Sequence, residues 1–416
     1  MSLNPTPSVD YVPGDPEPLL SAAALERLRR MARDAGAPQR LLDLDDVELL
    51  RELGLLTPGG LAREALLLAG SEDGLNQYFP EYRWKYEYHW GAGRKPDCME
   101  GNAPLPVALM RLLERIRSGA SILVMPPSSQ AFEHRPYPEP ALLAALLNAF
   151  CHVDYALGVP VQARQEAARV EFVSPGSMPA DIFPDNILRR RDARRNPLLI
   201  QALTRLGLAN QAETGMQRMV RALLGEGFQP PDYDLQANQV RISFIGGGTV
   251  ARFRLFVEKE IQEGRPMTLE ILLLLHAALQ QPEIDEEIIA HVCQVDVPTA
   301  LALLDEMDRE RGYLQRMFTG EEAAWALRRE MYDRIYDERL LKRQRRWYRD
   351  KLKERVLHIL KQRAEEGAEG ISNAEIRQMT RLKAHRSRTL LYEMMSEHPQ
   401  IEHIDRGRSS IFRWRG

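Results

Sequence analysis

The chain has 416 residues, of which 44% are hydrophobic and 28% are charged, and these fractions are typical of proteins that fold in water. No apolar run reaches the roughly 20 residues of a membrane-spanning helix, and the first residues lack the basic-then-apolar order of a signal peptide. Three widely spaced cysteines exclude a disulfide framework and a cysteine metal cluster. We therefore expect a cytoplasmic protein with two to four domains and no membrane segment.

The charge is distributed unevenly along the chain. The formal net charge is −3, but residues 340–416 contain 19 Lys and Arg against 10 Asp and Glu, a net charge of +9. The remainder must then carry −12. A basic end on an acidic body indicates that the C-terminal segment binds nucleic acid, because phosphate groups attract clustered Lys and Arg.

The N-terminal part of the chain is predicted to be helical. Residues up to about 18 are rich in Pro, Ser and Asp, and we expect them to lack fixed structure. Apolar residues then recur with helical spacing at 22–35 and 43–53, and a glycine-containing turn leads into a third helix at 62–68.

Residues 82–90 alternate aromatic and polar side chains, a pattern that predicts a strand with one buried face. Alternating aromatic and basic residues also form stacking platforms for nucleic acids, but core packing is the interpretation we favour. A helix is predicted at 105–118, and strands at 121–126 and 130–134.

The most informative stretch covers residues 137–219. An apolar helix at 141–150 is followed by predicted strands at 159–164 and 169–173. The motifs that follow in order are Cys151-His152-Val153-Asp154-Tyr155, Ser174-Pro175-Gly176-Ser177, Arg195-Asn196-Pro197-Leu198-Leu199-Ile200, Leu206-Gly207-Leu208 and Glu213-Thr214-Gly215-Met216-Gln217-Arg218-Met219.

This order of motifs resembles the RecG-like, ATPase-like domain of bacterial transcriptional regulators that carry an N-terminal Schlafen-type AlbA domain. The resemblance covers about the middle third of the chain. It implies an α+β fold, in which a sandwich like that of the GHKL ATPases (gyrase, heat-shock chaperones and histidine kinases) is followed by winged-helix modules. It further implies a site for ATP and Mg²⁺.

By this resemblance, Asn148 is the Mg²⁺ ligand, since an amide oxygen is a hard ligand that suits this ion. The other nucleotide-binding positions implied by the family are His152, Asp154, Gly176, Thr214 and Gly215. Glycine at such turns lets the backbone approach phosphate groups closely.

The chain departs from the family pattern at several positions. The family carries a glutamate, the general base that activates water, where this chain has Ala144. The first glycine turn is only partly kept around Gly176, and Glu213 replaces a glycine, so that a carboxylate would face phosphate oxygens. We therefore predict a degenerate nucleotide site without catalytic residues; Glu139 and Asp154 are the remaining, poorly matched candidates for a base.

Each site residue also has an interpretation that needs no ligand. Asn148 is equally well explained as a buried, hydrogen-bonded residue of the core. His152 and Asp154 are better explained as groups that cap the helix end and hold the following loop. Gly215 could supply a positive φ angle, and Asn196 could cap the helix that begins at Pro197.

After a predicted closing strand at 240–245, the sequence indicates two units of three helices and a strand. The first has helices at 268–280, 285–293 and 298–309 and a strand at 313–318, the order of a winged helix. Its second and third helices are acidic or neutral, so we expect packing or dimerisation rather than DNA contact through them. A long charged helix is predicted at 321–355.

The C-terminal unit is the predicted DNA-binding module. Helices at 355–364 and from 373 onward, the second opened by a Ser372–Glu375 capping box, precede a third helix at 384–396 and two wing strands at 401–404 and 410–414. The predicted contacts to double-stranded DNA are Lys383, His385, Arg386, Ser387 and Arg388 in the third helix, and Arg406 and Arg408 at the wing tip.

The sequence thus predicts five segments: a helical connection at 1–75, the ATPase-like domain at 76–248, a winged-helix-like module at 262–320, a linker helix at 321–355 and the DNA-binding module at 356–416. No AlbA domain of about a hundred residues, the length the resemblance implies, fits before residue 76. We expect a DNA-binding regulator whose central domain senses a nucleotide or acts as a dimerising scaffold. Two alternatives stay open, a working GHKL-type ATPase and a protein-interaction scaffold without nucleotide.

Overall fold

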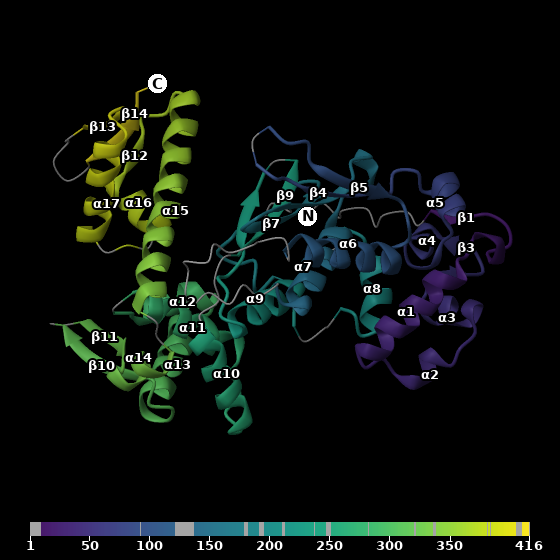
Figure 1. Cartoon of the computed structure of the whole chain (residues 1–416), viewed down its shortest axis with the longest axis horizontal. Helices are drawn as coiled ribbons and strands as arrows, with labels where there is room; N and C mark the ends of the chain where they lie inside the picture. Colours follow the sequence, from purple (N-terminus) through teal and green to yellow (C-terminus); the bar gives the residue numbers. More distant parts are fainter. Residues whose placement is uncertain are drawn as a thin grey trace, which may run out of the picture. The chain divides into compact units, whose positions relative to one another are not determined.

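The structure is a computed structural model that describes residues 10–91, 93–120, 137–178, 182–190, 195–209, 213–236, 238–246, 251–281, 283–319, 322–335, 338–380, 382, 384–404 and 410–415. The predicted strands at 121–126 and 130–134 lie outside these residues. The chain divides into two compact units: Met1–Leu274 with His291–Val295, and Leu275–Ala290 with Asp296–Gly416. Figure 1 shows the elements of both units along the chain.

The N-terminal segment of the first unit is mainly helical, as predicted. Its elements are β1 (Tyr11–Val12), a 3-10 turn (Glu17–Leu19), α1 (Ala22–Asp34), α2 (Gln39–Leu42), α3 (Asp46–Glu52), β2 (Leu56–Thr57), β3 (Gly60–Ala62), α4 (Arg63–Ala69) and α5 (Glu72–Tyr78). The expectation that residues before 18 lack fixed structure is wrong for β1, because Tyr11 and Val12 pair with Ala62 and Leu61 in a small antiparallel sheet.

A six-stranded sheet forms the centre of the first unit. Its strands are β4 (Trp84–Tyr88), β5 (Asp97–Gly101), β6 (Val161–Glu166), β7 (Arg169–Pro175), β8 (Asp232–Leu235) and β9 (Gln239–Ile245), in the spatial order β5-β4-β6-β7-β9-β8. Only β4 and β6 run parallel, and the other neighbours are antiparallel. Strands β6, β7 and β9 lie at the positions predicted from the sequence.

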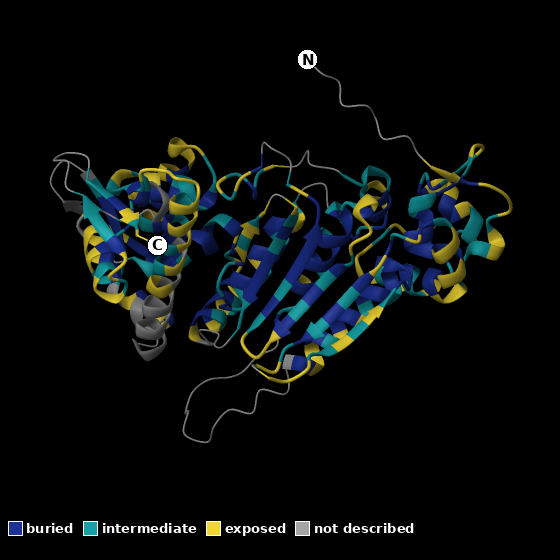
Figure 2. Ribbon diagram, turned by 90° about the horizontal axis from the view of Figure 1, so that it is seen from above, coloured by how far each residue is buried: buried dark blue, intermediate teal, exposed yellow. Residues whose placement is uncertain are grey.

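Helices cover one face of this sheet, and the other face is polar. Figure 2 shows buried and half-buried residues alternating along the strands. In β4 the aromatic side chains of Trp84, Tyr86 and Tyr88 are all buried, so core packing explains the aromatic alternation. The covering helices include α6 (Leu105–Ala120), α7 (Glu139–His152) and α9 (Gly215–Gly225) (Figure 1).

Three further helical elements belong to the first unit. A 3-10 turn (Tyr155–Leu157) follows α7, α8 (Pro197–Arg205) precedes α9, and α10 (Ala251–Gln262) follows β9. The sequence analysis did not predict α10.

The next elements match the first predicted three-helix module. They are α11 (Leu269–Gln280), α12 (Glu286–Cys293), α13 (Val297–Arg309) and β10 (Leu314–Thr319). The long helix predicted at 321–355 is wrong in its first part, because β11 (Glu322–Leu327) pairs antiparallel with β10 and is followed by the short α14 (Arg329–Ile335). Trp325 of β11 is fully buried, and its burial favours the strand over the helix that the alanine-rich sequence suggests.

The last module begins with α15 (Glu338–Glu365), which includes the helix predicted at 355–364. The short β12 (Ile371–Ser372), α16 (Asn373–Thr380), α17 (Ala384–Glu397), β13 (Ile401–Ile404) and β14 (Ile411–Trp414) follow, and the three strands form a sheet in the order β12-β14-β13. Its core is apolar and includes residues of every element. No single helix among the described residues is long and apolar enough to cross a membrane.

Candidate functional site

The end of helix α7 carries the first candidate group. Asn148 is half-buried and makes no hydrogen bond with any residue that the structure describes. The interpretation of Asn148 as a buried, hydrogen-bonded core residue is therefore wrong. Ala144, one turn earlier on the same side of the helix, is only 3% exposed. The amide of Asn148 thus has no partner among the described residues of the domain, while the position of the missing base is filled by a small buried residue.

The loop after α7 holds Asp154 in three ways. Its carboxylate accepts a hydrogen bond from the backbone N–H of Ala156 at 3.2 Å, and its own N–H donates to the carbonyl of Pro175 at 2.8 Å. It also forms an ion pair with Arg195, with 2.8 Å between Oδ2 and Nη1. Asp154 therefore caps the 3-10 turn and fastens the loop, as the ligand-free interpretation proposed. His152 lies half-buried in the last turn of α7.

Arg195 connects this loop to the glycine turn. Its guanidinium donates to the carbonyl of Ser177 at 2.9 Å. Gly176 has a φ of +111°, and a Cβ at that position would overlap Arg195 and lie 2.9 Å from Cβ of Asp154. Glycine is required here for both its backbone angle and its small size. The structure thus brings Asp154 and Gly176 together, and Arg195 is a member of the cluster that the sequence analysis missed.

Asn196 has a different role from the one predicted. It stands at the N-cap position of α8, with Pro197 as the first helical residue, but its side chain makes no capping bond there. Instead its Nδ2 donates to the carbonyls of Cys151 and Val153, both at 3.0 Å. Carbonyls at a helix end lack partners within the helix, so Asn196 caps the C-terminus of α7 from a distant part of the chain.

The Thr214–Gly215 motif forms the start of helix α9. Thr214 and Gln217 make a reciprocal capping box: Oγ1 of Thr214 accepts from the N–H of Gln217 at 3.1 Å, and the N–H of Thr214 donates to Oε1 of Gln217 at 2.8 Å. Gly215 does not have a positive φ, and a Cβ there would meet open space. The proposed need for a positive φ at Gly215 is therefore wrong.

Glu213 does not present a free carboxylate at this helix start. Its two oxygens accept from Nε and Nη2 of Arg221, each at 2.8 Å. This hydrogen-bonded pair raises the pKa of Arg221. Because the charge of Glu213 is balanced inside the domain, the repulsion of a phosphate that we expected from the sequence is reduced.

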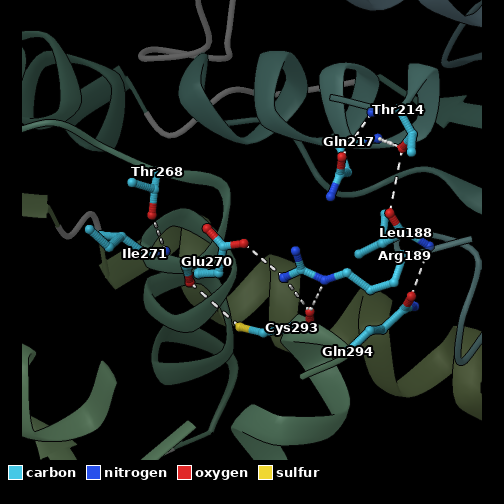
Figure 3. Close-up of polar contacts among 9 residues, drawn as sticks. All are labelled: Leu188, Arg189, Thr214, Gln217, Thr268, Glu270, Ile271, Cys293 and Gln294. Atoms are coloured by element: carbon cyan, nitrogen blue, oxygen red, sulfur yellow. Dashed lines mark hydrogen bonds and ion pairs between the residues drawn. The ribbon is translucent and has the colours of Figure 1, made fainter. Parts of the chain in front are cut away.

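The segment between the glycine turn and α8 connects α9 to two other helices (Figure 3). Oγ1 of Thr214 lies 3.5 Å from the carbonyl of Leu188. The N–H of Leu188 donates to Oε1 of Gln294 at 2.8 Å, and Nε2 of Gln294 donates to the carbonyl of Pro184 at 2.8 Å. Gln294, which follows α12, has a φ of 53°, an angle that costs a non-glycine residue about 1–2 kcal/mol.

Arg189 strengthens the same connection. It pairs with Glu270 at the start of α11, with 2.7 Å between Nη2 and Oε1, and donates to the carbonyl of Cys293 at 2.9 and 3.2 Å. Burial is the largest single influence on Glu270 and would raise its pKa, but hydrogen bonds from Arg189, the backbone and Thr268, together with the charge of Arg189, outweigh it and lower the pKa. The segment 184–189 therefore lies between the start of α9 on one side and the start of α11 and the end of α12 on the other.

The C-terminal module holds the second group of candidates. The predicted capping box is confirmed: Oγ of Ser372 accepts from the N–H of Glu375 at 3.1 Å, and Oε2 of Glu375 accepts from the N–H of Ser372 at 2.8 Å. Arg363 pairs with the same carboxylate at 2.9 Å. The hydrogen bond from the Ser372 backbone is the main reason that the pKa of Glu375 falls to about 2.

The predicted DNA contacts differ in their placement. Arg386 and Arg388 are exposed on α17. Ser387 is fully buried and donates from Oγ to Oδ1 of Asn373 at 2.8 Å. Its predicted contact with DNA is therefore wrong, because it ties α17 to α16. Lys383, Arg406 and Arg408, and the side chain of His385, lie outside the part that the structure describes.

Many basic side chains of this module are neutralised within it. The ion pairs join Arg349 and Lys353 of α15 to Glu393 and Glu397 of α17, and Arg413 and Arg415 of β14 and its end to Glu402 of β13. Among the described side chains, Arg377, Arg386 and Arg388 are exposed and have no acidic partner. The sequence analysis did not single out Arg377, which lies near the end of α16.

Across the described residues, no group of three His, Cys, Asp or Glu side chains is placed to hold a metal ion. A single Asn ligand does not make a site by itself, so Mg²⁺ at Asn148 would need phosphate oxygens of a nucleotide as further ligands.

Comparisons with known proteins support the fold of the central domain. Residues 158–244 match a family model described as "Putative ATP-dependent DNA helicase recG C-terminal". The match covers β6, β7, β8 and β9 with α8 and α9, and this part of the α+β chain is therefore similar to the RecG-like, ATPase-like domain.

The crystal structure of the DIP2311 protein from Corynebacterium diphtheriae is similar over the whole chain, with a TM-score of 0.63 and 20% sequence identity, and the similarity covers 70% of that protein. At this identity the likeness concerns the fold alone. No curated protein matches the chain.

Proposed function

We propose that this chain is a cytoplasmic, DNA-binding transcriptional regulator. In this proposal residues 356–416 form a winged helix that binds double-stranded DNA. Residues 76–248 form a degenerate ATPase-like domain that senses a nucleotide or serves as a scaffold, and residues 262–320 form a second, winged-helix-like module that packs against partners or a second copy.

One observation carries the DNA-binding part. In a C-terminal segment with a net charge of +9, ion pairs neutralise Arg349, Lys353 and Arg363 of α15 and Arg413 and Arg415 at β14 and its end. By contrast, Arg377, Arg386 and Arg388 stay exposed and unpaired among the described residues. These three lie at the end of α16 and the start of α17. Unpaired arginines are the groups that bind phosphates and guanine edges, so the start of α17 is the expected contact.

The nucleotide-sensing part rests on the geometry around α7 and α9. Asn148 has an amide without a partner in the described residues, the turn at Gly176 lets the backbone approach closely, and the start of α9 at Thr214 and Gly215 offers a helix N-terminus. Helix N-termini attract phosphate groups. We propose that ATP with Mg²⁺ is the ligand class, held by these groups together with Asp154 and His152.

Fluorescence anisotropy of a labelled duplex tests the proposal. The full chain is titrated at two salt concentrations, with and without Mg·ATP. We expect salt-sensitive binding, because each phosphate contact releases counterions, and a change of affinity on addition of Mg·ATP. If Mg·ATP does not change the DNA affinity, the central domain acts as a scaffold. If the chain does not bind the duplex even at low salt, the DNA-binding role is refuted.

A working ATPase is the rival function. The general base of such an enzyme is missing, because Ala144 occupies its position. The two alternative carboxylates form ion pairs, Asp154 with Arg195 and Glu139 with Arg117. Steady phosphate release that is abolished by Asn148→Ala would favour this rival, and binding of neither DNA nor nucleotide would favour a protein-interaction scaffold.

A further inference from the structure

The outward face of helix α17 combines one basic and one aromatic side chain. The opposite face is fixed in the core, since Leu390, Leu391 and Met394 are all buried. Arg388 and Tyr392 are four residues apart and therefore lie one turn apart on the same side of the helix. Arg388 is exposed and Tyr392 is 57% exposed. Such exposure is unusual for a large aromatic ring, and the Tyr392 ring is not part of the module core.

Tyr392 is held in place although it is exposed. Its ring meets the ring of His403 edge-on, with 6.4 Å between centroids and an interplanar angle of 78°. His403 in turn stacks on Phe412, with centroids 4.7 Å apart and an angle of 16°. Phe412 is buried in the module core. A chain of aromatic contacts therefore fixes the Tyr392 ring against the strand pair, so that little side-chain freedom would be lost on binding.

The charge along α17 changes at this point. The acidic residues of its second half, Glu393 and Glu397, are paired with Arg349 and Lys353 of α15. The first half carries Arg386 and Arg388 without described acidic partners. Tyr392 thus lies where the basic first half of α17 meets its second half. The acidic side chains of that second half are neutralised by ion pairs, so a polyanion can approach Tyr392.

We infer that Arg388 and Tyr392 are the base-contacting residues of this helix, an inference that rests on the proposed DNA-binding function. Arg388 donates two hydrogen bonds to O6 and N7 of a guanine in the major groove, and the Tyr392 ring packs on the 5-methyl group of a thymine. Four helical residues span about 6 Å, and base pairs are about 3.4 Å apart. The guanine and the thymine therefore stand about two base pairs apart.

Selection of bound sequences from a random duplex pool tests the inference with the full chain. The wild type is expected to enrich a guanine and a thymine at this spacing. Arg388→Ala lowers the preference for guanine by about 5- to 150-fold, the range of a bidentate contact. Tyr392→Ala removes the preference for thymine and leaves the guanine preference and the salt dependence unchanged, whereas Tyr392→Phe, which keeps the ring, retains both.

A variant that changes the selected base, rather than abolishing selection, shows that the effect does not come from unfolding. Tyr392→Gln is expected to shift the selected base from thymine to adenine, because a Gln amide pairs with N6 and N7 of adenine. Tyr11→Ala, at another exposed tyrosine (44% exposed), serves as the control and leaves the selected motif unchanged.

The outcomes separate the two proposals. A wild type that binds no duplex refutes the proposed function itself. A wild type that binds without sequence preference, or a folded Tyr392→Ala or Tyr392→Gln variant that selects the wild-type motif, overturns the inference and leaves DNA binding intact.

Discussion

The side chain of Gln294 accepts a hydrogen bond from the backbone N–H of Leu188 at 2.8 Å. The two residues are 106 positions apart, and the contact joins the end of α12 to the segment that precedes α8. Because the carbonyl of Leu188 faces Thr214 at the start of α9, the same segment contacts the proposed nucleotide site on one side and the helices α11 and α12 on the other (Figure 3). A movement of α9 on ligand binding would therefore change the hydrogen bonds that Leu188 and Gln294 make with each other and with their neighbours.

Gln294→Gly should separate nucleotide sensing from DNA binding. Glycine accepts the φ of 53° without strain, so the substitution removes only the two side-chain hydrogen bonds, at a cost of about 1–3 kcal/mol. We expect DNA affinity without nucleotide to stay the same and the effect of Mg·ATP on it to disappear, as measured by anisotropy. Gln281→Ala, whose side chain bonds to no described residue, is the control, and a Gln294 variant that still responds to Mg·ATP would argue against this connection.

Asn148→Ala should weaken nucleotide binding without affecting stability. The amide makes no hydrogen bond within the described structure, so its removal should change the free energy of unfolding by no more than about 0.5 kcal/mol. Calorimetric titration with Mg·ATP measures the binding. A loss of stability of several kcal/mol would instead return Asn148 to the role of a structural residue.

Gly176→Ala should destabilise the ATPase-like domain more than Gly158→Ala. Both glycines have a positive φ, but a Cβ on Gly176 would overlap Arg195, whereas a Cβ on Gly158 meets nothing within 4 Å. Alanine at such an angle costs about 1–2 kcal/mol in either place, and the clash adds to this at Gly176. Thermal unfolding of the two variants gives the comparison, and equal losses would mean that Arg195 moves away freely.

Arg377 of α16 and Arg386 of α17 should determine the salt dependence of DNA binding. Replacing Arg377 and Arg386 together by Ala should reduce the slope of log affinity against log salt by about two, because each of the two exposed side chains neutralises one phosphate. The paired Arg415, which contacts Glu402, provides the matched control, and its replacement should change the slope much less. An unchanged slope in the double variant would place the DNA-binding surface elsewhere.

The C-terminal module should lose stability in acid. The pKa of Glu375 is about 2 in the folded chain against an ordinary value of 4.5, so the carboxylate stabilises the fold above pH 4.5, and this contribution is lost as the pH falls from about 5 to 2. Hydrogen exchange of the amides of α16 measures the effect. Glu375→Gln should be less stable at pH 7 and should change less between pH 5 and 2 than the wild type.

Local sequence patterns predicted the elements whose partners are close in the chain or whose burial is one-sided. The aromatic alternation at Trp84, Tyr86 and Tyr88 predicted a strand with a buried face because side chains of a strand alternate between its faces. The Ser372–Glu375 capping box predicted a helix start because all of its hydrogen bonds lie within four residues. The order of motifs around Asn148, Gly176 and Thr214 indicated the ATPase-like domain before any tertiary contact was known.

Only the tertiary structure decided the contacts between residues distant in the chain. Residues 322–327 form a strand because Trp325 is buried and paired with β10, and this pairing outweighs the helical preference of the alanines around it. Asn196 caps α7 rather than α8, and Glu213 is neutralised by Arg221. Ser387 faces Asn373 while Tyr392 faces outward, because the direction of each side chain on α17 depends on where the core of the folded module lies.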